Sequence, residues 1–204
     1  MQALLEFYPY ELSDTIAADE TYIKILGKTA YIFFYFDAIK KIVTSYRVFD
    51  KRDSLSSIKA AYSTLSKYDT LPESLKVISD GNPIYNVACQ FWAQNELPFQ
   101  LLQVIGLTNL DDTSKEYRSQ KQIIERFNRT LKYYYRPKGG FTNLDNANNY
   151  MVLFATYNNF LRPNKSLDWK TPVEIPEIDR ATNMPNKWIE LIKIANSYAE
   201  SYFE

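Results

Sequence analysis

Residues 30–37 form an almost uninterrupted aromatic and β-branched run, AYIFFYFD. A strand that is apolar on both of its faces needs cover on both sides, so this run predicts the central strand of a sheet. Residues 20–26 alternate before it, residues 41–49 form a third extended run, and short turns join the three. This pattern predicts an antiparallel meander.

The rest of the chain mixes helical and extended patterns. Ser54 is expected to cap one helix, and Pro83 to open another. In order, the expected elements are helix 54–68, strand 75–79, helix 83–95, strand 99–105, loop 106–117, and helices 118–136, 144–161 and 187–202. A meander followed by alternating strands and helices predicts an α/β fold, a mixed five-stranded sheet with helices on both faces.

Composition limits the chemistry that this chain can perform. Its 204 residues include no histidine, which excludes histidine bases, Ser-His-Asp triads and His/Cys zinc sites. The single cysteine, Cys89, lies in an apolar run and is expected to be a small core residue in a reducing compartment. Lys plus Arg number 24 and Asp plus Glu number 24, so any nucleic-acid affinity must come from local patches.

Three acidic residues stand out by their positions. Asp19 opens the first strand, Asp80 ends the fourth strand, and Glu125 lies on the helix expected over 118–136. If the first and fourth strands are neighbours, the two aspartates project together and the helix need only dock beside them. Like charges 4 Å apart repel by about 4 kcal/mol at an effective dielectric near 20, and hard divalent cations relieve this repulsion. Oxygen ligands suit Mg²⁺ or Mn²⁺, and a pair of such ions is common machinery for phosphoryl transfer.

Structural alternatives exist for each of these acids. Asp19 could cap a strand and Asp80 a turn or helix, while Lys121 and Arg129, four residues to either side, could neutralise Glu125. Asp37, which ends the second strand, is a rival candidate for the site. The acids expected to be solvated in loops are Asp50, Asp53, Asp111 and Asp112.

The helix expected over 118–136 has two contrasting faces. At about 100° per residue, one side is apolar and the other is mostly cationic, with Glu125 as its one carboxylate. The apolar side holds Ile124, Phe127, Leu131 and Tyr134, and the polar side holds Arg118, Gln122, Glu125, Arg129, Lys132 and Arg136. A face that binds a metal through Glu125 and contacts phosphates on either side would have this composition.

Four segments in order resemble the motifs of one known family. They read DETYIKI at 19–25, VISDG at 77–81, IERFNRTLK at 124–132, and YNNFLRPN at 157–164 followed by TPVE at 171–174. Together they resemble the catalytic domain of insertion-sequence transposases of the DDE superfamily, an integrase core-like domain. The resemblance covers residues 18 to 178.

The resemblance implies a ribonuclease H-like fold and metal-dependent DNA cleavage and strand transfer in transposition, with two Mg²⁺ or Mn²⁺ ions. By motif position it makes Asp19, Asp80 and Glu125 the catalytic metal ligands. Its DNA partners would be transposon ends and target, bound by a homo-oligomer. Phosphate contacts are then expected from Arg129, Lys132 and Arg136, with Arg118 and Lys121 as further contacts.

The same resemblance divides the chain into a lead-in segment (1–17), a ribonuclease H-like DDE catalytic domain (18–178) and a C-terminal helical extension (179–204). The sequence shows neither a signal peptide nor a run of about 18 apolar residues. We therefore expect a cytoplasmic protein, associated with the nucleoid in a prokaryote.

Departures from the family pattern leave two alternatives open. Asp80 and Glu125 are 45 positions apart, more than is usual, and the extra residues are expected in the loop 106–117. Gln122 replaces the usual asparagine and Asn164 the usual histidine, and no DNA-binding region is expected before Asp19. The alternatives are an inactive or domesticated remnant that binds DNA or another partner, and a ribonuclease H-like nuclease.

Overall fold

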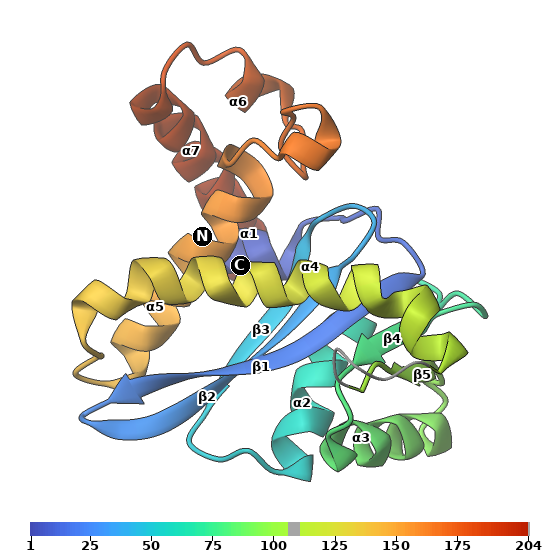
Figure 1. Ribbon diagram of the computed structural model, residues 1–204. Coiled ribbons are helices and arrows are strands. Elements are labelled where there is room, and N and C mark those ends of the chain that lie inside the picture. Colours follow the sequence, from blue (N-terminus) through green and yellow to red (C-terminus); the bar gives the residue numbers. More distant parts are fainter. Residues whose placement is uncertain (106–110, 204) are drawn as a thin grey trace.

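A computed structural model describes residues 1–105 and 111–203 of the chain (Figure 1). Its centre is a five-stranded sheet in the order β3-β2-β1-β4-β5. The first three strands pair antiparallel, whereas β4 pairs in parallel with both β1 and β5. The strands are β1 (Thr15–Ile25), β2 (Lys28–Asp37), β3 (Val43–Phe49), β4 (Lys76–Ser79) and β5 (Gln100–Gln103). This arrangement confirms the predicted mixed sheet.

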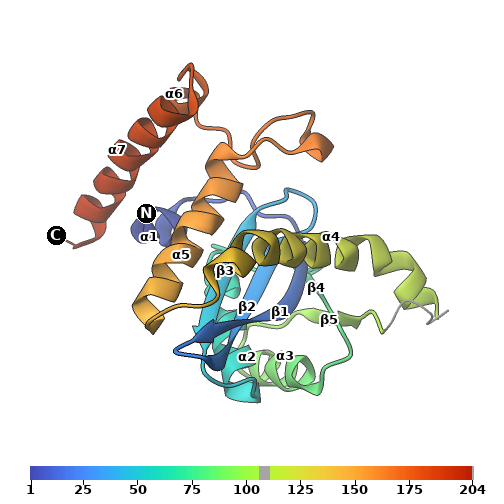
Figure 2. The same cartoon turned by 60° about the vertical axis from the view of Figure 1, so that its left-hand side comes forward.

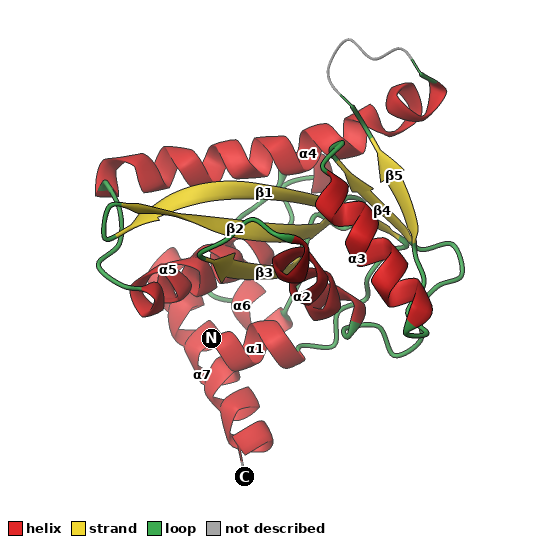
Figure 3. Ribbon diagram, turned by 90° about the horizontal axis from the view of Figure 1, so that it is seen from below, coloured by secondary structure: helices red, strands yellow, loops and turns green. Residues whose placement is uncertain are grey.

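Helices cover both faces of the sheet, α2 and α3 on one side and α4 and α5 on the other (Figures 1 and 3). The α-helices are α1 (Gln2–Phe7), α2 (Ser54–Leu65), α3 (Pro83–Gln94), α4 (Asp112–Tyr135), α5 (Leu144–Thr156), α6 (Pro176–Asp179) and α7 (Met184–Phe203). Shorter helical segments are η1 (Arg136–Lys138), the π-helical η2 (Tyr157–Leu161) and η3 (Lys165–Leu167). No helix among the described residues is long and apolar enough to cross a membrane.

Strand β2 is buried on both faces, as its sequence predicted. Phe34 and Phe36 pack into the cluster beneath α4 and α5, where Phe127 contacts both rings. Phe33 and Tyr35 point into the other cluster, beneath α2 and α3. Successive side chains of a strand alternate between faces, so one aromatic run supplies both cores.

Helix α4 turns Ile124, Phe127 and Leu131 toward the sheet, as predicted. The fourth apolar position was predicted wrongly: Tyr134 is 48% exposed, and Tyr135 is buried in its place. The Tyr135 hydroxyl accepts a hydrogen bond of 2.6 Å from the backbone N–H of Lys24, which fixes the C-terminal end of α4 against β1.

Several element boundaries differ from the prediction, mostly because acidic side chains cap the helices. Asp53, rather than Ser54, is the N-cap of α2, and its carboxylate accepts from the backbone N–H of Ser56. Asp111 caps α4 through the N–H of Ser114, so this helix begins at Asp112 instead of residue 118. Such caps satisfy N–H groups that the helix itself leaves without a partner. The rest of the predicted loop, residues 106–110, lies outside the described residues.

A third apolar cluster joins the two ends of the chain. Leu4 of α1 and Leu191 of α7 are both fully buried there, together with Phe160 of η2. Figure 2 shows α7 running beside α1 and away from the sheet. The lead-in segment also supplies Thr15 to Ala17 to β1, which starts five residues before the predicted Glu20.

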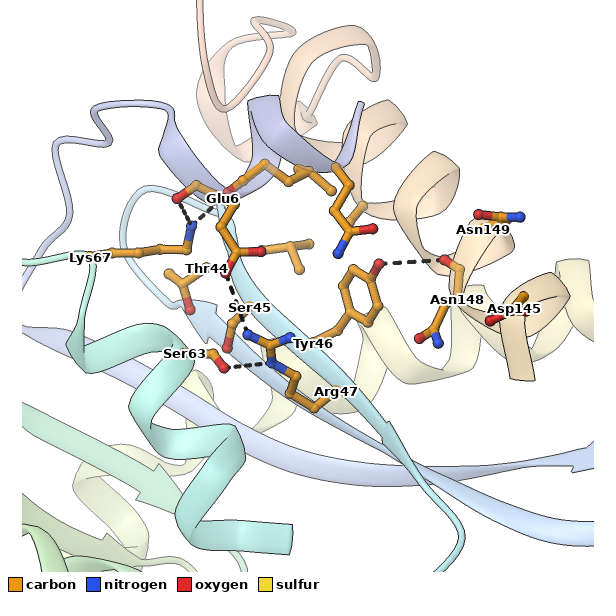
Figure 4. A pocket seen from close by; sticks show the side chains of 14 residues that line it. Glu6, Thr44, Ser45, Tyr46, Arg47, Ser63, Lys67, Asp145, Asn148 and Asn149 are labelled. Carbon is orange, nitrogen blue, oxygen red and sulfur yellow. Dashed lines mark hydrogen bonds and ion pairs between the residues drawn. The ribbon is translucent and has the colours of Figure 1, made fainter. Parts of the chain in front are cut away.

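Lys67, which lies just after α2, binds the C-terminal end of α1. Its ammonium donates hydrogen bonds to the backbone carbonyls of Leu5 (2.6 Å) and Glu6 (3.0 Å) and lies 5.1 Å from the centre of the Tyr10 ring (Figure 4). The surrounding pocket of about 330 Å³ is lined by charged groups that bond to the chain itself, such as Arg47 with Ser63 and Glu6. Burial lowers the pKa of Lys67 to about 8.

The lowered pKa of Lys67 predicts that stability rises with pH. The unfolded lysine has a pKa of about 10.4, so the unfolded chain binds the proton more tightly than the folded chain does. The free-energy cost of burying the charged lysine is therefore lifted as pH rises from about 8 to 10. Relative to Lys67→Met, the wild type should gain roughly 1–2 kcal/mol of unfolding free energy between pH 8 and pH 10, measured by urea titration. The exposed lysine variant Lys59→Met should follow the wild-type profile, and a Lys67→Met profile parallel to both would contradict the burial.

Candidate functional site

The candidate site lies where β1 extends past the end of β4. The parallel pairing of these strands covers only Thr15 to Ala17 of β1, opposite Lys76 to Ile78 of β4. Beyond that point β4 ends and its chain turns through Asp80 into α3. The predicted adjacency of the first and fourth strands is therefore confirmed, and the edge of β1 that holds Asp19 faces the Asp80 turn.

Three carboxylates converge at this edge. One oxygen each from Asp19, Glu20 and Asp80 lies within 4.8 Å of the other two. Two of these residues, Asp19 and Asp80, were predicted as site residues, and Glu20 was not. All three are partly buried, which strengthens their mutual repulsion relative to water.

Helix α4 is joined to Asp19 by two side chains. The Lys121 ammonium lies 2.8 Å from one carboxylate oxygen, and the Asn128 amide donates to the other at 2.8 Å. The pair is shielded from water, because the side chains of Lys121 and Asp19 are only 7% and 16% exposed. The predicted cation Lys121 thus binds a carboxylate of the site in this structure.

Glu125 lies on the face of α4 that contacts Asp19. It follows Lys121 by four residues and precedes Asn128 by three, spacings that place all three on one side of a helix. Its carboxylate does not belong to the group of converging oxygens found among the described residues. Within that part of the chain Lys121 pairs with Asp19 rather than with Glu125.

Glu20 is the residue that sequence reasoning missed. Because side chains alternate along a strand, Glu20 is expected on the other face of the sheet from its neighbour Asp19. Its carboxylate still reaches the Asp80 turn, because β4 no longer covers this edge of β1. It accepts hydrogen bonds from the Tyr85 hydroxyl (2.6 Å) and the Asn82 amide (3.1 Å), and it pairs with Arg52. Burial raises the pKa of Tyr85 well above its usual value, so its hydroxyl remains a donor to Glu20.

The Asp80 carboxylate is oriented by the turn that follows it. The backbone N–H of Asn82 donates to Asp80 at 3.0 Å, while the Asn82 side chain contacts Glu20 and accepts from the N–H of Ile84 as the N-cap of α3. One asparagine therefore joins the two acids to the start of a helix.

Asp37, the rival candidate, is a structural residue. Its buried carboxylate accepts from the backbone N–H groups of Ser13 (2.6 Å), Ile39 (2.9 Å) and Lys40 (2.7 Å), and from the Ser13 hydroxyl (2.8 Å). These bonds close the turn after β2 and fix the segment before β1. These four hydrogen bonds from the chain satisfy the buried Asp37 carboxylate, so its burial is explained by a structural role.

The other predicted phosphate-binding cations occupy different environments on α4. Arg129 is exposed on the helix and Arg136 at its end, whereas Arg118 is partly buried. The Lys132 ammonium lies 4.6 Å from the centre of the Tyr22 ring on β1. These cations are spread along α4 and its end, and among the described residues none of them forms an ion pair with the three converging carboxylates.

The donor set fits a hard divalent cation. Carboxylate oxygens within 4.8 Å of one another are the ligands that Mg²⁺ and Mn²⁺ prefer, and neither sulfur nor imidazole is near them in the described chain. In this structure the positive charge beside Asp19 comes from Lys121.

Solved structures share this sheet and its covering helices. The catalytic core of HTLV-2 integrase, solved in complex with magnesium, matches with a TM-score of 0.55 at 17% identity, covering 79% of this chain and 95% of that chain. A chain of the simian T-cell lymphotropic virus intasome, solved in complex with PP2A regulatory subunit B56 gamma, matches with a TM-score of 0.55 at 18% identity, covering 85% of this chain and 61% of that chain. The BIV integrase core gives 0.51 at 17% identity over 78% and 91%. The fold is therefore that of integrase catalytic cores, which is ribonuclease H-like.

Comparison with protein families matches residues 13–164 to a family described as a DDE domain. Because this match spans more than half of the sequence, the chain belongs to this DDE-domain family of transposases. A comparison with curated proteins finds no match.

Breaking the contact between Lys121 and Asp19 should destabilise the fold. Lys121→Met leaves a largely buried carboxylate without its cation, which should lower the unfolding free energy by about 3 kcal/mol in EDTA, measured by urea titration. The control Lys115→Met removes an exposed lysine of the same helix and should change stability by less than about 1 kcal/mol. Equal stability of the two variants would show that the buried pair does not hold α4 to β1.

Proposed function

We propose that this chain is the catalytic domain of a DNA transposase and performs metal-dependent DNA cleavage and strand transfer. The observation that carries the proposal is the convergence of Asp19 and Asp80, which come from separate motifs inside the matched DDE domain. The integrase-like fold supports the same reaction class. The catalytic domain would span residues 18–178.

Asp19, Asp80 and Glu125 would hold the metal, with Glu125 supplied by the face of α4 that contacts Asp19. Two Mg²⁺ or Mn²⁺ ions bound there would polarise the scissile phosphate and activate an attacking oxygen. Asn128 holds α4 beside Asp19, and Glu125, three residues before it on the helix, would join the two aspartates from that side.

The residues around the acids would position them and the DNA. Asn128 orients Asp19, and Asn82 orients Asp80 through its backbone N–H. Phosphate contacts by cations of α4 would align the strand but would not read its sequence. The cations proposed for these contacts are Arg118, Lys121, Arg129, Lys132 and Arg136.

The proposed partners are transposon ends and target DNA, bound by a homo-oligomer of this chain. The structural relatives include an integrase core in a trimeric form and an integrase within an intasome. An assembly of copies would join two DNA ends in one event, which a single site cannot do.

Removal of the Asp80 carboxylate should abolish DNA cleavage. With Mn²⁺, the wild type should nick supercoiled DNA, while Asp80→Asn should lose at least about 100-fold in rate, since one carboxylate of the metal site is missing. Asp69→Asn, which neutralises an exposed aspartate elsewhere, serves as the matched control and should nick like the wild type. Undiminished nicking by Asp80→Asn would refute the assignment of the site.

Calorimetric titration separates the enzyme from an inactive remnant of the same fold. The wild type and Asp69→Asn should bind Mn²⁺ saturably, and Asp19→Asn should not. Absence of saturable binding by the wild type would favour the non-catalytic interaction module instead.

A further inference from the structure

A second feature of α4 lies on the side of the helix turned away from Asp19, where Ser119, Ile123 and Thr130 line it. The residues around the YNNFLRPN motif fold over α4 and leave a groove of about 620 Å³ between them. Figure 2 shows this segment, with the short η3, projecting above α4 after η2. Phe36 and Phe127 form part of the groove lining, and Arg126 lines it from α4.

The groove is strongly cationic in a chain whose net charge is zero. Arg126 from α4, Lys41 from the β2–β3 turn, and Arg162 and Lys165 from the folded segment all line it. The described lining residues include no aspartate or glutamate. Burial lowers the pKa of Lys41, the Asp37 carboxylate acts against this shift, and the nearby Arg126 charge adds to it.

An exposed indole lies at the same groove. Trp169 is 69% exposed, although large aromatic side chains usually pack into a core. Its backbone and that of Asp168 adopt positive φ angles of 64° and 53°, a left-handed conformation that aspartate tolerates but that is strained for tryptophan.

A closed turn fixes this strained backbone. The N–H of Trp169 donates to the carbonyl of Asn164 (3.0 Å), and the N–H of Asn164 donates to the carbonyl of Lys170 (2.9 Å). The Asn164 side chain accepts from both the N–H and the hydroxyl of Ser166 (3.0 and 2.8 Å). The turn therefore maintains an exposed indole beside a row of cations.

We propose that this groove binds single-stranded DNA, with Trp169 stacking on an unpaired base while Arg126, Arg162 and Lys165 contact phosphates. Cationic grooves with exposed aromatic side chains bind single strands in this way, whereas a duplex hides its base faces. This inference rests on the proposed function and deepens it, since it gives a DNA strand a second contact on α4, the helix that also contacts Asp19.

Fluorescence anisotropy of a labelled oligothymidylate tests the groove in EDTA, where the metal site makes no contribution. The full chain should bind an oligonucleotide of about 20 nucleotides more tightly than a blunt duplex of the same length. Trp169→Ala should weaken single-strand binding about tenfold, and Phe91→Ala, which removes an exposed aromatic ring from α3, should not change it.

Salt dependence tests the phosphate contacts. Arg126→Gln and Lys165→Gln should each lower the slope of log affinity against log salt by about 0.7, while Lys59→Gln on α2 leaves it unchanged. Thermal unfolding of each exposed-residue variant verifies that its fold is intact. Unchanged binding by all groove variants, or tighter binding of the duplex or of RNA, would overturn the inference. Nicking by the wild type with Mn²⁺ would then still stand, so the two proposals fail separately.

Discussion

The contact of α4 with Asp19 is the interaction on which the site depends. Lys121 and Asn128 bind the two oxygens of one carboxylate on β1, and the apolar face of the same helix covers the sheet. A largely buried charge pair is costly to break, so the register of α4 against β1 is fixed at this point. Glu125 is thereby held beside the acidic edge, and Arg126 is turned toward the neighbouring groove.

The difference in length between β1 and β4 creates the rest of the site. β1 has 11 residues and β4 has four, so the edge of β1 beyond Ala17 is left open to the turn that follows β4. Asp19 and Glu20 reach this turn from the strand, and Asp80 reaches them from the turn. Asn82 then connects Asp80 and Glu20 to α3. The position of the acids therefore depends on where the strands end as well as on the acidic residues themselves.

Strand patterns predicted the sheet because the alternation in β2 and the apolar periodicity of α4 are local properties. The site was only partly predictable. Glu20 was missed because its role depends on where β4 stops, and the Lys121–Asp19 pair joins residues 102 positions apart. The first turns of α4 were predicted to be a loop because that segment contains turn-forming residues, although Asp111 caps them as a helix. Tertiary docking, which no local pattern encodes, decided the roles of Glu20 and Lys121.

A crystal structure with Mn²⁺, with the ion located by its anomalous scattering, tests the central claim most directly. The acidic edge should show Mn²⁺ between Asp19 and Asp80, with the Lys121 ammonium withdrawn from Asp19 and the Glu125 carboxylate turned inward. Mn²⁺ absent from this edge at saturating concentration, with Lys121 still paired to Asp19, would contradict the assignment of a catalytic metal site.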